Sequence, residues 1–333
     1  MIEPFTWRDA GRTVVFREDA LAEASSLLAE HGFEGYELIT TPRALAEVPA
    51  LEGPAVAVHE VAHGGVPEAA AAILSAAGRR LVALGGGRVI DSAKAVAAVT
   101  GASVAALPTT LSGAEMTAIH RLPAGAESRA TGLVRPDLVL ADPLAMTGQP
   151  EPQLRASAMN ALAHGADSLY TPFANPVSRM TALRGAELIA GALDEERAGR
   201  ERGRLALGSL LCGYAIDSAL FALHHVICQT LVRVLGTPHA ETNAAILPRA
   251  MAAMRNRAPD PIADLAWALG TGADGIEERI LELGGQPAGL GELGAERSGL
   301  GAALDAIEAR AELKFTPDPP RREEIAAIVE SAW

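Results

Sequence analysis

The chain has 333 residues, of which 49% are hydrophobic and 21% are charged, and its formal net charge is −13 at pH 7. This composition is typical of a globular protein and excludes a disordered chain, while the length exceeds one ordinary hydrophobic core and predicts two domains. The negative charge excludes nucleic acid as a partner, because no basic field would attract phosphates.

The cysteines and the apolar segments indicate the compartment. Cys212 and Cys228 lack Cys-x-x-Cys spacing and fall in apolar helical patterns, which indicates buried thiols in a reducing compartment. The segment Met1–Trp7 lacks the pattern of a signal peptide, and every long apolar run is broken by a charge, Gly or Pro. We therefore expect a cytoplasmic protein with no membrane partner.

Residues 13–141 alternate between predicted strands and predicted helices. The strand patterns cover residues 13–16, 36–40, 55–59, 81–84, 104–107 and 138–141, and the helix patterns cover residues 20–30, 67–77 and the segment after residue 87. Such alternation predicts an α/β fold, a doubly wound parallel sheet that binds ligands at the carboxyl ends of its strands. Two short segments, Ala118–Leu122 and Thr131–Val134, predict a hairpin across Gly125.

After Pro150 the strand patterns nearly vanish and long helical patterns follow. They cover residues 153–170, 176–192, 200–217, 222–235 and 241–254, and shorter ones cover 261–269, 276–283, 299–313 and 322–331. The change predicts an α/β domain over residues 1–149 and an all-helical domain over residues 150–333.

The segment Leu81–Lys94 joins a buried strand to a helix through Gly85, Gly86 and Gly87. A turn of this kind presents free backbone N–H groups and the positive end of a helix to a phosphate, and a Cβ would block the approach. Because the pattern matches neither G-x-G-x-x-G nor a P-loop, a tight turn without a ligand remains the alternative.

A second segment of the same type, Pro108–Thr117, follows the next predicted strand. Its hydroxyl groups on Thr109, Thr110 and Ser112 can bond a ribose or a phosphate. The alternative is a loop that its own side chains cap.

The helical half carries histidines in suggestive positions. Asn160 and His164 are four residues apart and share one face of a helix. His225 lies in an apolar helix, and His239 follows Pro238 at a predicted helix start. Side chains of this type can hold a divalent metal or move protons. The adjacent His224 is better interpreted as a satisfied core residue.

Together these segments resemble the iron-containing alcohol dehydrogenase superfamily, most closely its maleylacetate reductase branch. The similar segments are 85–94, 108–117, 159–170, 223–231 and 238–248, in order within a match from about Phe5 to Pro248. The resemblance implies a Rossmann-like NAD(P)-binding domain, a helical catalytic domain with the active site between the two, and a homodimer.

The resemblance also implies roles for individual residues. Those expected to bind the cofactor are Gly85, Gly86, Gly87 and Ser92 along the pyrophosphate, and Thr109, Thr110 and Ser112 in the nucleotide cleft. Those in the positions of the family's metal-binding and catalytic residues are Asn160, His164, His225 and His239. If a metal were present, His164, His225 and His239 would hold it.

Two departures from the family pattern fall on the expected substrate side. Asn160 replaces the metal-binding aspartate, as it does in the maleylacetate reductase branch. Gln229 follows His225 by four residues, where both branches commonly have another histidine, and Val232 and Arg233 replace the usual glycine pair.

We therefore expect an NAD(P)H-dependent oxidoreductase that transfers hydride to a small polar enone, keto acid or other carbonyl compound. Among the candidate catalytic residues, His225 is the expected proton donor, since an imidazole titrates near neutral pH. One alternative is a metal-dependent (iron or zinc) alcohol dehydrogenase. The alternative of another class is a nucleotide-binding protein that has lost redox catalysis.

Cofactor preference and metal content follow from single positions. The strand ending at Thr40 leads into Thr41 and Arg43, with no acidic residue to repel a 2′-phosphate, so we expect NADPH to be accepted at least as well as NADH. Asn160 in place of an aspartate leaves a metal with only neutral ligands. We therefore expect no tightly held metal.

Overall fold

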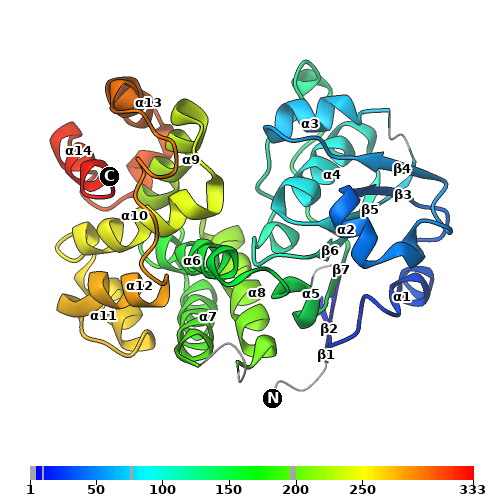
Figure 1. The fold of residues 1–333 in the computed structure, drawn as a ribbon, viewed down its shortest axis with the longest axis horizontal. Helices are drawn as coiled ribbons and strands as arrows, with labels where there is room; N and C mark the ends of the chain where they lie inside the picture. The colour runs from blue at the N-terminus through cyan, green and yellow to red at the C-terminus, as the bar shows by residue number, and fades with distance from the viewer. Residues whose placement is uncertain (1–4, 10, 76–77, 196–199) are drawn as a thin grey trace. The chain divides into compact units, whose positions relative to one another are not determined.

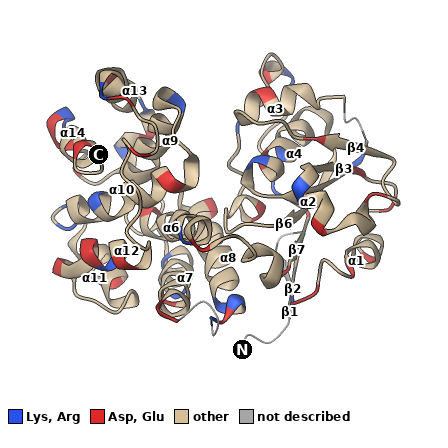
Figure 2. Ribbon diagram, in the orientation of Figure 1, with Lys and Arg blue, Asp and Glu red and all other residues tan. Residues whose placement is uncertain are grey.

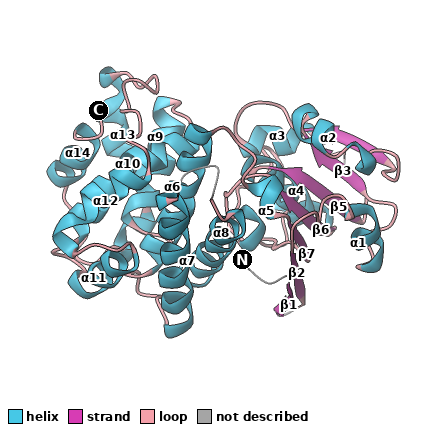
Figure 3. Ribbon diagram, turned by 60° about the horizontal axis from the view of Figure 1, so that its bottom comes forward, coloured by secondary structure: helices cyan, strands magenta, loops and turns pink. Residues whose placement is uncertain are grey.

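The computed structural model describes residues 5–9, 11–75, 78–195 and 200–333. The chain divides into two compact units, Met1–Gly148 and Gln149–Trp333 (Figure 1). All the strands belong to the first unit, and the second consists of helices and loops in its described part (Figure 3).

The first unit is built on a seven-stranded sheet with the order β1-β2-β7-β6-β5-β3-β4. Its strands are β1 (Phe5–Asp9), β2 (Arg12–Phe16), β3 (Glu37–Thr40), β4 (Ala57–Glu60), β5 (Arg80–Gly85), β6 (Ser103–Pro108) and β7 (Leu138–Ala141). β1 pairs with β2 in antiparallel register, whereas all the other neighbours are parallel. The expected α/β class with a doubly wound parallel sheet is thus confirmed.

The helices of the first unit cover both faces of this sheet. They are α1 (Ala24–Glu30), α2 (Pro42–Glu47), α3 (Val66–Ala72), α4 (Gly87–Thr100) and α5 (Pro143–Met146), with short 3-10 helices η1 (Pro49–Leu51), η2 (Ala114–Met116) and η3 (Glu127–Arg129). The sequence prediction missed β1 and α2. The last two residues of the predicted helix 67–77 lie outside the described residues.

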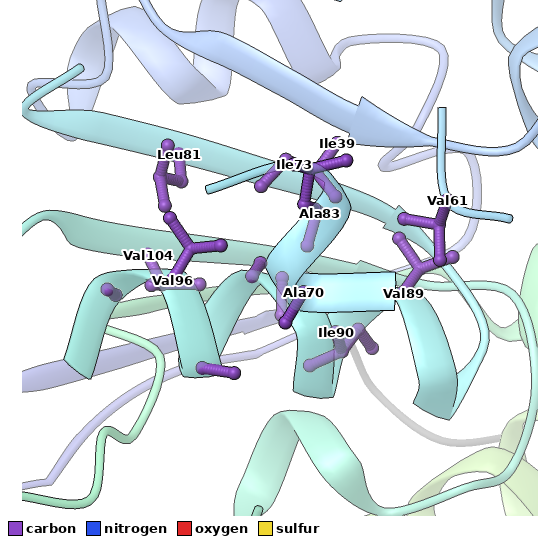
Figure 4. Packing of buried hydrophobic residues seen from close by; sticks show 14 of the residues in the cluster. Ile39, Val61, Ala70, Ile73, Leu81, Ala83, Val89, Ile90, Val96 and Val104 are labelled. Carbon is purple, nitrogen blue, oxygen red and sulfur yellow. The ribbon is translucent and has the colours of Figure 1, made fainter. Parts of the chain in front are cut away.

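Side chains of the central strands alternate between the two faces. Leu81 and Ala83 of β5 pack with α3 and α4 in one cluster (Figure 4). Val82 and Leu84 pack with α1, α2 and η1 in another. This period of two requires apolar residues at every position of a strand that is covered on both sides, which is why β5 is a continuous apolar run.

The helices that follow β3 and β5 leave toward opposite faces. α2 joins the cluster of Val82 and Leu84, whereas α4 joins the cluster of Leu81 and Ala83. Because β3 and β5 are neighbours, the carboxyl ends of these strands form the switch point at which doubly wound sheets bind ligands. The Thr40 hydroxyl donates to the carbonyl of Leu84, at 2.9 Å, and ties the two ends together.

The predicted hairpin across Gly125 is wrong. Residues 118–136 form no strand, and η3 lies within them. Their mutual backbone hydrogen bonds are local turns, such as that from the Ala126 amide to the carbonyl of Pro123. Their longer-range bonds go to other elements: the Thr131 amide donates to the carbonyl of Ala98, and the Ala124 amide donates to that of Pro67. The apolar Val134 that suggested a strand packs singly against the cluster around α4.

The second unit confirms the predicted helices with small shifts of their ends, except that the helix predicted over residues 299–313 ends at Glu308 and is followed by a separate 3-10 helix, Ala311–Phe315. They are α6 (Glu151–Ser168), α7 (Pro176–Asp194), α8 (Arg202–Ala219), α9 (Leu223–Leu235), α10 (His239–Met254), α11 (Pro259–Ala268), α12 (Ile276–Leu283), α13 (Leu300–Glu308) and α14 (Arg322–Glu330), with η4 (Ala273–Gly275), η5 (Arg297–Gly299) and η6 (Ala311–Phe315). α7 and α8 pack closely through glycines, since a Cβ on Gly185 would lie 2.9 Å from the carbonyl oxygen of Gly208.

Charge and hydropathy vary along these helices. Acidic and basic residues are interspersed in both units (Figure 2). Among the described helices, none is by itself both long and apolar enough to cross a membrane. α8 and α9 meet these two criteria only when they are taken together, and a bend of 99° separates them.

Candidate active site

The glycine turn between β5 and α4 has the geometry of an anion-binding turn. Gly85 has a φ of 155°, and a Cβ there would lie 2.7 Å from Val89 Cγ2. Gly86 is the N-cap of α4 and offers no side chain to its first N–H groups. Those N–H groups and the helix dipole are therefore directed at whatever lies before the helix, which favours an anion.

The turn and the hydroxyl-rich segment after β6 lie together. A Cβ on Gly86 would lie 3.0 Å from Thr110 Cγ2, and one on Gly87 would lie 2.9 Å from Ser112 Cβ. The Thr109 amide donates to the carbonyl of Gly85, at 3.0 Å. The structure thus brings together the glycines and hydroxyls that the sequence predicts as cofactor-binding. The same contacts give these glycines a packing role.

Lys94 holds the hydroxyl-rich segment in place. It is fully buried on α4, and its ammonium donates to Asp91 at 2.7 Å, to the carbonyl of Ala114 at 2.9 Å and to that of Ile119 at 3.1 Å. Arg12 adds a bond to the Met116 carbonyl, at 2.8 Å. Lys94 thus forms an ion pair with Asp91 on its own helix.

The remaining predicted cofactor residues lie in three different settings. Thr41 is the N-cap of α2, and its hydroxyl accepts from the Ala44 amide at 3.3 Å. Arg43, on the same helix, has a side chain that is 71% exposed and lies 3.5 Å from Glu47. Ser92 is buried inside α4, and its hydroxyl has no hydrogen-bond partner in the described part of the chain.

The histidines of the second unit converge from three helices. His164 comes from α6, His225 from the start of α9 and His239 from the first residue of α10. The rings of His164 and His225 stack with their centres 5.0 Å apart and an angle of 17° between planes. Asn160 is buried one turn before His164 on α6, whereas His239 is exposed.

A buried carboxylate, Asp167, orients His225. Its Oδ2 accepts from Nδ1 of His225 at 2.8 Å, and its two oxygens accept the backbone N–H groups of Ala222, His224 and His225 at 3.0–3.3 Å. The Tyr170 hydroxyl also donates to it. Since Nδ1 carries the proton given to the carboxylate, Nε2 is the ring atom left for chemistry. It is buried and has no partner among the described residues.

Two of the buried histidines have lowered pKa values, which disfavours their charged forms. Burial, followed by the charge on His225, lowers the pKa of His164 well below its ordinary value. The same two causes lower the pKa of His224 to about 3. His224 is a satisfied core residue, as expected, since its Nε2 bonds the amide oxygen of Asn243 at 2.8 Å. His225 is then the ring beside which a carboxylate can balance a proton.

Asp167 was not predicted from the sequence, although a signal existed. It is the acidic residue three positions after His164 on a helix otherwise rich in alanine, so both side chains lie on one face. As for a metal, no group of three or more His, Cys, Asp or Glu side chains is arranged to hold one in the ranges that the structure describes.

These features define a class of protein: one unit with a dinucleotide-type switch point and glycine turn, and one helical unit with a carboxylate-oriented histidine cluster. Two protein-family models match the sequence. The family model for iron-containing alcohol dehydrogenase matches residues 11–143, and the family model for the C-terminal part of Fe-containing alcohol dehydrogenases matches residues 155–333. The chain belongs to this family.

Individual relatives place the chain within the family. It is 35% identical to maleylacetate reductase 1 of Rhodococcus opacus over 261 residues, which cover 76% of this chain and 72% of that protein. It is 30% identical to the maleylacetate reductase of Rhizobium sp. strain MTP-10005, over 100% of this chain and 98% of the relative. The crystal structure of maleylacetate reductase from that strain superposes with a TM-score of 0.83 at 28% identity, covering 100% of this chain and 99% of that one. The chain is thus an NAD(P)H-dependent oxidoreductase on the maleylacetate reductase branch.

Glu115 makes the stability of the first unit depend on pH. It is completely buried in η2, and its two carboxylate oxygens have no hydrogen-bond partner among the described residues. Burial raises the pKa of Glu115 to about 7, although the charges of Lys94 and Arg12 oppose the shift. The folded protein therefore binds a proton here more tightly than the unfolded chain does.

We predict that the free energy of unfolding falls as the pH rises from about 5 to 8. The contribution of Glu115 is fully present below the ordinary pKa of 4.5 and is lost as the pH passes about 7. A shift of this size corresponds to roughly 3 kcal/mol at most. Urea unfolding at several pH values should show a flatter profile for Glu115→Gln than for the wild type or the exposed control Glu52→Gln. Parallel profiles would contradict the assignment.

Proposed function

We propose that the protein reduces a conjugated keto acid of the maleylacetate type with NAD(P)H, and that His225 donates the proton. The observation that carries this proposal is the orientation of His225, whose Nδ1 is bound to buried Asp167 while Nε2 is buried and free of partners in the described chain. A ring held in one tautomer, with one open nitrogen, suits a general acid. The names of the relatives support the substrate class.

The chemistry divides between cofactor and protein. NAD(P)H, when bound, would supply a hydride to the electrophilic carbon of the conjugated double bond, and the substrate would then be an enolate. His225 then gives its Nε2 proton to the resulting enolate, and Asp167 stabilises the imidazolium until that step. His164, kept neutral, can bond the carbonyl oxygen without adding a second positive charge.

On the cofactor side, the proposed contacts follow the glycine turn. The N–H groups that begin α4 at Gly87 would bind the pyrophosphate, and the hydroxyls of Thr110 and Ser112 would lie beside it. Lys94 would contribute indirectly, as a positioning residue, because its hydrogen bonds hold this segment against α4. The segment then needs little rearrangement to bind the cofactor.

We further propose a cytoplasmic homodimer that acts on a small molecule. The thiols support a reducing compartment, since Cys212 and Cys228 are free and buried. Sedimentation equilibrium of the purified chain tests the dimer, and fractionation of the producing cells tests the location.

Removal of His225 tests the catalytic role. We predict that His225→Ala lowers kcat at saturating NADPH by roughly a hundredfold or more, the usual contribution of a positioned acid. Asp167→Asn should lower kcat in the same direction, because an amide cannot balance the imidazolium charge. Fluorescence titration should give unchanged NADPH affinity for both, and His31→Gln serves as a control. If His225→Ala turns over at the wild-type rate, the role is wrong. If wild-type protein binds NADPH yet reduces no enone or carbonyl compound in a panel, the non-catalytic alternative is favoured.

The metal-dependent alcohol dehydrogenase remains the second candidate, because His164, His225 and His239 occupy the positions of the family's metal-binding histidines. We propose instead that turnover needs no tightly held metal. With aspartate at position 160, a divalent ion would leave a net charge of +1 by formal count, and Asn160 raises this to +2 while offering only an amide oxygen.

We therefore predict that protein purified without chelator or affinity nickel keeps its turnover in EDTA and holds less than stoichiometric metal. Elemental analysis and the activity assay measure the two quantities. Asn160→Asp should bind zinc or iron more tightly than wild type, since a carboxylate replaces an amide. Stoichiometric metal whose removal abolishes turnover would establish the alcohol dehydrogenase candidate.

Cofactor preference is proposed to depend on Arg43. Its exposed ion pair with Glu47 is worth little, so the guanidinium is available to a 2′-phosphate. We predict that NADPH is used at least as well as NADH, and that Arg43→Ala raises the KM for NADPH while leaving that for NADH unchanged. Steady-state kinetics with both cofactors measure this. A preference for NADH of more than about a hundredfold, roughly 2.7 kcal/mol, would contradict it.

A further inference from the structure

A second polar group, the guanidinium of Arg310, lies close to the histidine cluster. Arg310 is the N-cap of η6, which packs against α9, and its side chain is only 14% exposed. Its Cζ lies 6.0 Å from the centre of the Phe221 ring, and that ring lies 5.9 Å from the ring of His225. A single phenyl ring therefore separates the guanidinium from the imidazole.

Most of the donors of Arg310 are occupied, but one nitrogen is not. Nε and Nη2 each donate to an oxygen of Glu312 at 3.0 Å, and Nη2 also donates to Oε1 of Gln229 at 3.1 Å. Nη1 is buried and has no hydrogen-bond partner within the described ranges. Since arginine stays protonated and buried N–H groups are nearly always bonded, Nη1 indicates an acceptor that comes from outside the chain.

Gln229 connects this guanidinium to the catalytic helix. It follows His225 by four residues on α9, so both side chains lie on one face. Its amide oxygen accepts from Arg310 without adding charge. The countercharge comes from Glu312, whose side chain is 34% exposed and is therefore screened by water on that side. The edge of the guanidinium at Nη1 is thus the one that meets no acceptor among the described residues.

We propose that Nη1 of Arg310 binds a carboxylate of the substrate, with Gln229 and Glu312 as positioning residues. This inference rests on the proposed function, because it assigns one end of the same keto acid. A carboxylate is the acceptor that a guanidinium binds most strongly, through charge-assisted hydrogen bonds.

The distance along the substrate selects which carboxylate is bound. His225 serves the reacting double bond, which in maleylacetate carries one carboxylate directly. Arg310 lies one ring farther away, so it matches the other carboxylate, which a ketone and a methylene separate from that bond. Phe221 covers the intervening carbon atoms with an apolar face that is 9% exposed.

The experiment compares two substrates. Maleylacetate has both carboxylates, whereas acetylacrylate keeps the enone and the first carboxylate but ends in a methyl group where maleylacetate has a carboxymethyl group. Arg310→Met should lower kcat/KM for maleylacetate about a hundredfold, equivalent to ~2.7 kcal/mol, mainly through KM. For acetylacrylate the same variant should change kcat/KM by less than about threefold, because the deleted group has no partner there.

Three further variants separate recognition from folding. Arg310→Lys keeps the charge and should recover part of the loss, while Gln229→Leu should weaken maleylacetate selectively but less than Arg310→Met. Arg322→Met, which removes a guanidinium paired with Asp305 and Glu308 on α14, is the matched control and should leave both substrates unaffected. Equal losses for both substrates, or no loss for maleylacetate, would overturn the proposal.

Failure of the proposed function would give a different result. If wild-type protein reduces neither compound, that function is wrong, and Arg310 is tested by calorimetric binding of adipate and hexanoate to the NADPH-loaded protein. Adipate has as many carbons as maleylacetate and two carboxylates, and hexanoate has one. Selective loss of adipate affinity in Arg310→Met, tenfold or more, supports the carboxylate site. Equal affinities, or no binding of adipate by wild type, overturn it.

Discussion

The carboxylate of Asp167 is the contact on which the helical unit's candidate site depends. It accepts three backbone N–H groups at the start of α9, the hydroxyl of Tyr170 and Nδ1 of His225. Burial alone would raise the pKa of Asp167, but the hydrogen bond and charge of His225 hold it below the ordinary value. The same contact therefore caps a helix, fixes an imidazole tautomer and keeps a counter-ion ready. Loss of the carboxylate would leave several buried donors without an acceptor, at a cost of about 1–3 kcal/mol each.

The charge pattern of the histidines follows from this one anion. His164 and His224 are buried beside His225, and any proton on it disfavours a second one on them. Only the ring that touches Asp167 can be protonated without an unbalanced buried charge. Protonation of His164 and of His224 is thus disfavoured by their burial and by the neighbouring His225, on whose ring His164 stacks.

The sequence predicts the features that depend on local pattern. Continuous apolar strands, three glycines and a helix start were sufficient to predict the sheet class and the turn at Gly85, because backbone sterics and burial on both faces dictate them. The same reasoning failed at the hairpin across Gly125, because its backbone groups bond to Pro67 and Ala98, which are distant in sequence. β1 escaped prediction for a similar reason, since its pairing with β2 determines it more than its own pattern does.

In the candidate site, too, contacts between residues that are distant in sequence could not be predicted. These contacts explain why the departures from the family pattern were hard to interpret from the sequence. Gln229 accepts a hydrogen bond from Arg310, which lies 81 residues away in the sequence, so its role could not be inferred from the residues around it. Of the two departures, only the one at Asn160 removes a formal charge from the site. Asn160 removes an anion that would repel a carboxylate, and Gln229 holds a guanidinium without neutralising it. If Arg310 binds a carboxylate as proposed, the amide of Asn160 and the guanidinium of Arg310 would together suit an anionic substrate better than a bound cation.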